Sequence, residues 1–126
     1  MTPSTSTSTS TSTSTSNPPF LSDAATASLE DWGALPEATA DLMRTSGVIV
    51  WEDGEQQAGV WECTPGPSRW TLETNEVIYL VAGRMTVTPE GGESAEIGVG
   101  DMAVFPKGWT GTWDIHETVR KVYSIF

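Results

Sequence analysis

The chain has 126 residues, and its 17 acidic and 6 basic side chains give a net charge of −11 at pH 7. A chain of this length forms at most one domain. Its acidic character disfavours nucleic acids and anionic membranes, because both carry negative charge themselves. No stretch approaches the roughly 20 apolar residues that would cross a bilayer.

The single cysteine, Cys63, excludes an internal disulfide and a thiolate cage around a metal. The first residues lack the cationic and apolar blocks of a secretory signal. We therefore expect a cytoplasmic protein. Twelve glycines, eight prolines and six tryptophans favour β structure with many turns.

The first part of the chain has low complexity, since residues 4–16 alternate serine and threonine without interruption. Such a segment offers no hydrophobic surface to offset the entropy lost on ordering. We therefore predict a disordered tail over residues 1–17. Residues 18–46 are then an N-terminal extension that packs on the folded domain, which we assign to residues 47–126.

The extension contains helix-forming residues at 23–30 and again at 38–43. Pro36 suits the first position of a helix, and Gly47 would end one. One or two helical turns are therefore expected before the domain begins.

From Gly47 onward, short runs rich in β-branched and aromatic residues alternate with turn sequences. No helical period continues beyond Met43. Strands of this length and spacing predict an antiparallel sandwich or barrel and argue against βαβ units. We therefore expect an all-β fold, a jelly-roll barrel. The expected strands cover residues 48–51, 58–63, 69–72, 76–82, 84–88, 95–97, 102–105, 109–115 and 118–125.

Two segments are more specific than the composition. In the first, Glu76 and Gly83 are separated by six residues; in the second, Gly100 is followed after five residues by Pro106-Lys-Gly108. These segments resemble the two halves of the cupin signature. The resemblance is closest to small single-domain cupins grouped with (S)-ureidoglycine aminohydrolase and ethanolamine-utilisation protein Q. Further matching residues are 59–66, 111–113 and 117–123.

The resemblance implies a metal site, which this sequence does not retain. In cupins, a His-x-His pair, the glutamate and a later histidine hold a metal inside the barrel. The pair would fall at Arg69 and Thr71, or at Trp70 and Leu72, and the later histidine at Gly111. Only Glu76 remains of the four ligands.

A transition metal needs several converging donors, and one carboxylate with water binds weakly. The only histidine, His116, lies five residues after Gly111. An alternative site would regroup Glu62, Cys63 and Glu73 around Glu76. We expect neither a metal nor another cofactor.

Strand alternation predicts what lines the barrel. If position 111 faces inward, so do Trp109, Trp113 and Ile115, while Ile78 and Leu80 share the face of Glu76. Two tryptophans fill much of a small barrel, which favours a filled core. The alternative is an apolar pocket with a few polar groups, which is typical of small-molecule sites.

The inward Glu76 is the central candidate residue. Without a metal, a buried carboxylate must find a cation or take up a proton. Alternation places either Arg120 or Lys121 inside, and the sequence does not say which; Arg69 and Arg84 are the other candidate partners. With Lys121 inside, Glu76, Lys121 and Tyr123 would form a cluster suited to acid–base chemistry. The alternative is a purely structural ion pair.

The resulting hypothesis is a metal-free cupin that binds a small polar metabolite. The candidate catalytic residues are Glu76, Lys121 and Tyr123, and the candidate ligand-binding residues are Arg69, Glu76, Trp109 and Trp113. The alternatives are a metal-dependent enzyme like (S)-ureidoglycine aminohydrolase and a non-catalytic accessory protein. The resemblance also implies a homodimer.

Three other residues have plainer interpretations. Cys63 is expected to be a small buried hydrophobic residue. His116 falls at an apparent turn and is expected to be solvated. Tyr79, opposite in parity to Glu76, is expected outside the barrel or in a subunit contact.

Overall fold

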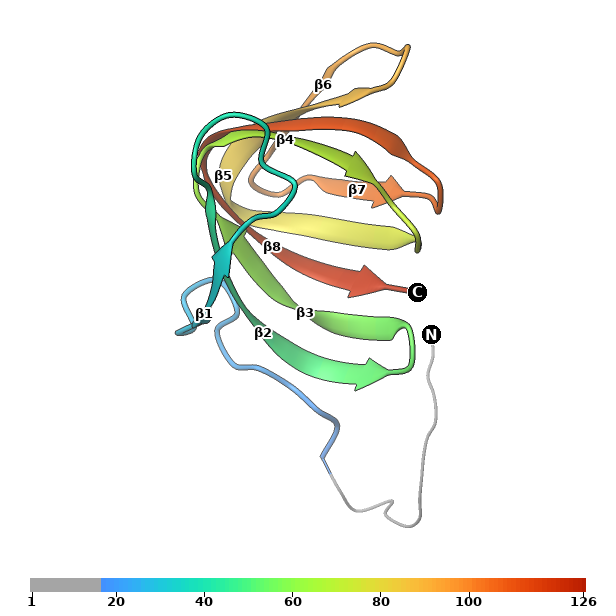
Figure 1. The fold of residues 1–126 in the computed structure, drawn as a ribbon. Helices are drawn as coiled ribbons and strands as arrows, with labels where there is room; N and C mark the ends of the chain where they lie inside the picture. Colours follow the sequence, from blue (N-terminus) through green and yellow to red (C-terminus); the bar gives the residue numbers. More distant parts are fainter. Residues whose placement is uncertain (1–16) are drawn as a thin grey trace.

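All strand pairs among the described residues are antiparallel, in a computed structural model that describes residues 17–126. These residues contain no helix, which confirms the expected all-β class. The predicted tail lies outside the described residues, except for Asn17. The strands are β1 (Glu30–Ala34), β2 (Arg44–Asp53), β3 (Gln56–Cys63), β4 (Gly66–Thr71), β5 (Glu76–Pro89), β6 (Ala95–Gly98), β7 (Met102–Phe105) and β8 (Thr110–Ile125) (Figure 1).

The two long strands β5 and β8 join two halves of the sheet. The C-terminal half of β8 lies between β3 and the first half of β5, and its N-terminal half lies between β4 and the second half of β5. Strands β7 and β6 then extend the two halves from β5. Register shifts between Leu80 and Met85 bend β5 where it passes from one half to the other. The ribbon curls accordingly around an interior (Figure 1).

The sequence predicted a break at Gly83 and another near His116, and both predictions were wrong. Gly83 adopts a positive φ of 81°, which bends β5 without ending it. Likewise, residues 110–125 form one continuous strand, because both halves of β8 keep their partners in β5.

The N-terminal extension forms a strand and loops where helical turns were expected. β1 pairs with β2, which itself begins at Arg44. Residues 22–26 form turns and not a helix. The Arg120 guanidinium donates hydrogen bonds of 3.0 and 2.9 Å to the carbonyls of Ala24 and Ala27. A continuing helix would need those carbonyls for its own N–H groups. None of the described residues forms a helix that could cross a membrane.

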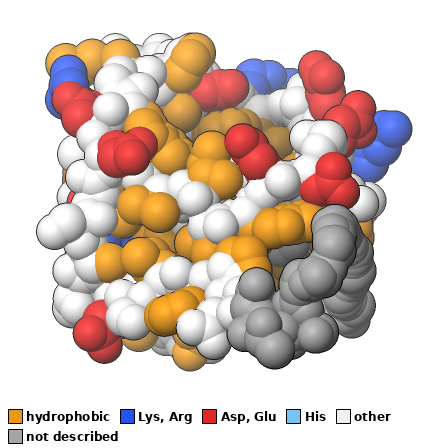
Figure 2. Space-filling model, turned by 90° about the horizontal axis from the view of Figure 1, so that it is seen from below, with side chains coloured by type: hydrophobic (Ala, Val, Ile, Leu, Met, Phe, Trp, Pro, Cys, Tyr) orange, Lys and Arg blue, Asp and Glu red, His pale blue; other side chains and the backbone are white. Residues whose placement is uncertain are grey.

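The core fills one part of the interior around Trp113, which is fully buried. The ring centroid of Trp113 lies 4.6 Å from that of Trp70 and 5.1 Å from that of Phe105. Ile78, Leu80 and Ile115 are buried as strand alternation predicted. The view from below shows that hydrophobic side chains also reach the surface, between scattered carboxylates (Figure 2).

Replacing Gly83 by alanine should destabilise the fold more than the same change at Gly91. Both glycines have positive φ, 81° at Gly83 and 75° at Gly91. A Cβ at Gly83 would lie 2.2 Å from the Thr118 carbonyl oxygen, whereas a Cβ at Gly91 would have no atom within 4 Å. We expect Gly91→Ala to lower the free energy of unfolding by about 1–2 kcal/mol. Gly83→Ala should cost about 1–3 kcal/mol more, since the backbone must move.

Urea denaturation followed by tryptophan fluorescence measures both losses. Equal losses in the two variants would mean that the close approach of β8 to Gly83 does not constrain the fold.

Candidate functional site

A buried ion pair joins β5 to β8 inside the barrel. Lys121 Nζ donates a hydrogen bond of 2.6 Å to Glu76 Oε2, and the two residues are only 4% and 7% exposed. Arg120 lies on the opposite face of β8 and bonds to Glu62 at 2.9 Å. Lys121 is therefore the inward basic residue that alternation left undecided.

Aromatic rings surround the rest of the ammonium group. Lys121 Nζ lies 4.5 Å from the ring centroid of Trp61, 4.7 Å from that of Trp113 and 5.7 Å from that of Tyr123. Ring faces attract cations at these distances, and the attraction is stronger where water is excluded. One carboxylate and three rings together compensate for the desolvation of the lysine.

A pocket of about 180 Å³ opens beside this ion pair. Its volume corresponds to about six water molecules at their share of liquid volume. The interior is thus filled around Trp113, whereas a pocket lies beside the ion pair. The lining residues are Trp32, Gln57, Trp61, Trp70, Glu76, Lys121, Tyr123 and Ile125.

The three candidate catalytic residues are brought together. Tyr123 follows Lys121 on the same face of β8, and its hydroxyl hydrogen-bonds to Gln57 Oε1. Burial, and then the negative charges of Glu76 and Glu52, raise the pKa of Tyr123 to about 12. The hydroxyl therefore remains protonated near neutral pH, where it can donate a hydrogen bond.

The other candidate ligand-binding residues do not line the pocket. Arg69 is exposed and pairs with Glu90 at 3.0 Å, because alternation along β4 turns its neighbours Ser68 and Trp70 inward. Trp109 packs edge-on against Phe105, with centroids 5.0 Å apart. Trp113 contacts the lysine with its ring but belongs to the core behind the pocket.

Sequence reasoning missed five lining residues. Trp61 shares the strand parity of Cys63 but was not proposed for a site, and Gln57 lay just before the predicted strand. Trp70 depended on the register of β4, which was left open. Trp32 belongs to the extension, where no strand was predicted. The fifth is Ile125, which shares the strand parity of Tyr123. Of these five, only Trp61 and Ile125 had a usable signal in strand parity.

The residues at the expected metal positions do not fit a metal. Trp70 pairs with Gly111 across β4 and β8, and neither residue has a side chain that binds a metal. Glu76 is bound to the Lys121 ammonium, and Glu62 to Arg120. In the described part of the chain, no group of three or more histidine, cysteine or acidic side chains could hold a metal ion.

Cys63 and His116 lie outside this pocket. Cys63 is fully buried, as expected; burial raises the pKa of its thiol to about 11, while the Lys121 ammonium acts in the opposite direction. His116 is half-buried within β8, with Nε2 2.7 Å from Thr86 Oγ1, so the expected turn was wrong.

Removing the lysine should cost far more than removing a surface arginine. Lys121→Met leaves the Glu76 carboxylate buried without its cation, for which we expect a loss of about 3–5 kcal/mol in the free energy of unfolding. Arg69→Met breaks an exposed pair and should cost less than about 1 kcal/mol. Adding Glu76→Gln to Lys121→Met should restore part of the loss. Urea denaturation tests this, and similar losses in both single variants would contradict a buried charge pair.

Stability should fall in alkali partly because of Cys63. The folded thiol ionises near pH 11 and an ordinary thiol near 9.0, so the unfolded chain loses this proton first as the pH rises. The buried thiol's contribution to the free energy of unfolding is fully present below pH 9 and is lost between pH 9 and 11. This contribution is on the order of 2 kcal/mol in total. Cys63→Ala should remove this part of the pH dependence in urea denaturation. An unchanged slope between pH 9 and 11 would contradict the assignment.

Comparisons with known proteins agree with the geometry. The family model for the EutQ-like cupin domain matches residues 50–123. A putative ethanolamine utilization protein Q from Salmonella typhimurium LT2 is 24% identical, with a TM-score of 0.62 over 75% of this chain and 76% of that one. A DUF861 family protein from Thermotoga maritima is 39% identical over 53% of this chain and 76% of its own, with a TM-score of 0.52.

A protein of unknown function of the DUF861 family from Pseudomonas syringae pv. tomato has a TM-score of 0.74 at 23% identity and matches 81% of this chain. This chain spans 46% of the length of that protein. No curated protein matches. The family match extends over more than half of the chain and confirms the resemblance found in the sequence. The chain therefore belongs to the EutQ-like cupin family.

Proposed function

We propose that this cupin binds a small polar metabolite in the pocket beside Glu76 and Lys121, without a metal. The observation that carries this proposal is a buried ion pair in the wall of an otherwise largely aromatic pocket. Small-molecule sites combine apolar walls with a few placed polar groups in this way. A solid barrel with an accessory role would have no use for such a pocket.

The polar groups can serve a ligand with both donors and acceptors. The Lys121 ammonium has three N–H groups, and its one hydrogen bond among the described residues goes to Glu76. The carboxylate has a second oxygen, and the Gln57 amide can also donate. The pocket, at about 180 Å³, suits a small ligand.

Binding requires only this arrangement, whereas catalysis requires a reacting group in reach. Acid–base chemistry by Glu76, Lys121 and Tyr123 therefore stays a prediction of the sequence, as does the cytoplasmic location. The metal-dependent alternative is less well supported, because the expected ligand positions hold Trp70, Leu72 and Gly111 or their neighbours.

Thermal denaturation in the presence of a panel of small polar metabolites tests the proposal. At a concentration one hundred times its Kd, a true ligand should raise the melting temperature by roughly 10 °C. Glu76→Gln should lose this shift, because the amide no longer balances Lys121. Glu90→Gln, at an exposed carboxylate, is the matched control and should keep it. A panel without any stabilising compound would count against the pocket as a binding site.

We also propose that the partner is a second copy of this chain, which packs on the outer face of β8, β5 and β7. In register, Tyr79 lies between Val122 and Met102, and Val77 lies between Ser124 and Val104. Tyr79, Met102 and Val104 are 47%, 68% and 56% exposed. These two rows contain no charged side chain, although the chain carries a charge of −11.

An uncharged apolar face suits association between acidic copies, because elsewhere like charges would meet. The chain's own first residues are a poor alternative cover, since residues 4–16 are serine and threonine only. A two-fold dimer would pair this face with itself. Tyr79 was expected outside the barrel or in a subunit contact, and it lies on the outer face.

Sedimentation of the full chain at micromolar concentration tests the dimer. The wild type should sediment as a dimer, and Val104→Glu should sediment as a monomer with an unchanged circular dichroism spectrum. Val99→Glu adds the same charge at a residue that is 65% exposed in the turn after β6 and belongs to neither row, and it should remain dimeric. A monomeric wild type, or a dimeric Val104→Glu, would refute the assignment of this face.

A further inference from the structure

A β-bulge in the N-terminal extension aims one tryptophan at the pocket. In the pairing of β1 with β2, Asp31 lies opposite Ser46 and Gly33 opposite Thr45, so Trp32 has no partner between them. A bulge of this kind redirects the side chain of the extra residue. Trp32 thereby becomes part of the pocket wall.

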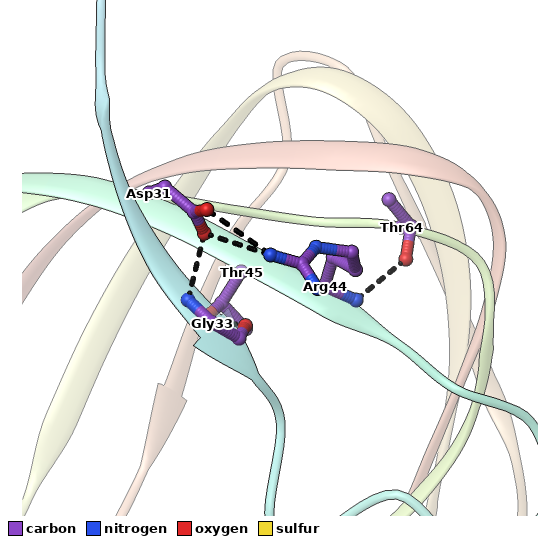
Figure 3. Close-up of polar contacts among 5 residues, drawn as sticks. All are labelled: Asp31, Gly33, Arg44, Thr45 and Thr64. Carbon is purple, nitrogen blue, oxygen red and sulfur yellow. Dashed lines mark hydrogen bonds and ion pairs between the residues drawn. The ribbon is translucent and has the colours of Figure 1, made fainter.

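Polar contacts on both sides of Trp32 hold the bulge (Figure 3). The Gly33 N–H donates to Asp31 Oδ1 at 2.8 Å, and Arg44 Nη2 donates to the two oxygens of the same carboxylate at 3.0 and 3.3 Å. Thr45 Oγ1 donates to the Gly33 carbonyl at 2.9 Å. Gly33 also has a positive φ of 83°, a conformation in which glycine is unstrained.

The indole occupies space that another residue leaves empty. A Cβ built on Gly47 would lie 2.4 and 2.5 Å from two ring carbons of Trp32. Gly47 pairs with Trp61 across β2 and β3, so the indole of Trp32 lies over the inner side of β2, next to the strand position of Trp61. The bulge therefore turns the indole of Trp32 toward β2, and the missing side chain of Gly47 leaves the space that this indole fills.

We propose that Trp32 is a specificity-determining residue and that the pocket takes a neutral, flat, ring-bearing molecule with an amide-like group. This inference rests on the proposed binding function. The indoles of Trp32, Trp61 and Trp70 line the pocket, and the rings of Trp61 and Trp70 lie at 77° to each other, so a planar ring that stacks on one meets the other edge-on. Lys121 supplies a donor for a carbonyl, and Glu76 an acceptor for an N–H group.

The ligand is neutral because the ion pair is already balanced. Lys121 and Glu76 are buried and cancel each other's charge. An ionised ligand would add a further buried charge without a partner, which is costly. Negatively charged relatives of the same molecule should therefore bind more weakly than the amide.

Binding of benzamide, cyclohexanecarboxamide and benzoate to the full ¹⁵N-labelled chain tests the inference. The indole N–H signals report binding and are assigned with single Trp→Phe variants. We expect benzamide to bind about three- to tenfold more tightly than cyclohexanecarboxamide, which has the same amide but a puckered ring, and more tightly than benzoate. Trp32→Ala should abolish the preference for the flat ring. Trp51→Ala, at an exposed indole on the outer side of β2, is the control and should preserve it.

A second variant tests the bulge while keeping the indole. Asp31→Ala removes the contacts that hold Gly33 and Arg44, and it should weaken the preference for benzamide as Trp32→Ala does. Glu90→Ala breaks the Arg69 pair, which has the same N–O distance of 3.0 Å and similar exposure, and should have no effect.

The outcomes separate this inference from the proposed function. If both amides shift the Trp61 and Trp70 signals but Trp32→Ala and Asp31→Ala keep the preference for benzamide, the role of Trp32 is wrong while binding stands. If benzoate binds as tightly as benzamide, the neutral class is wrong. If neither amide shifts any pocket indole, the ligand class is overturned, and the metabolite panel decides independently whether the pocket binds at all.

Discussion

The interior of this barrel contains a carboxylate that must be balanced by positive charge. Glu76 is balanced by Lys121 at 2.6 Å, and the rings of Trp61, Trp113 and Tyr123 face the ammonium. An isolated ion in such surroundings would cost several kcal/mol, so the two side chains depend on each other. The choice of Lys121 over Arg120 as the inward residue, and the polarity of the pocket, both follow from this pair.

The strands explain how the pair and the pocket come together. β5 and β8 each run through both halves of the fold, so residues near the start of β5 meet residues near the end of β8. The core closes around Trp113 in one part, while β1 brings Trp32 to the open part beside the ion pair. The same alternation leaves two uncharged rows on the outside, so the inner and outer faces of one sheet serve the two proposed functions, ligand binding and self-association.

Strand parity predicted much of the interior but could not place every side chain. It put Ile78, Leu80 and Trp113 inside, because a single register satisfied the apolar residues on each strand. Parity could not decide whether Arg120 or Lys121 points inward, since both residues are basic. Only their contacts distinguish them, because Arg120 pairs with Glu62 and Lys121 with Glu76. Arg69 was misplaced because the register of β4 was open. Trp32 was out of reach, because a bulge breaks the two-residue period on which parity depends.

Elemental analysis of the full chain, purified without a chelator, tests most directly whether Lys121, and not a metal ion, provides the positive charge that balances Glu76. We predict far less than stoichiometric manganese, zinc or iron, because Glu76 is already paired with Lys121, and Trp70 and Gly111, at the expected histidine positions, have no side chain that binds a metal. A tightly bound metal at one ion per chain, lost in Glu76→Gln, would contradict this account of the barrel.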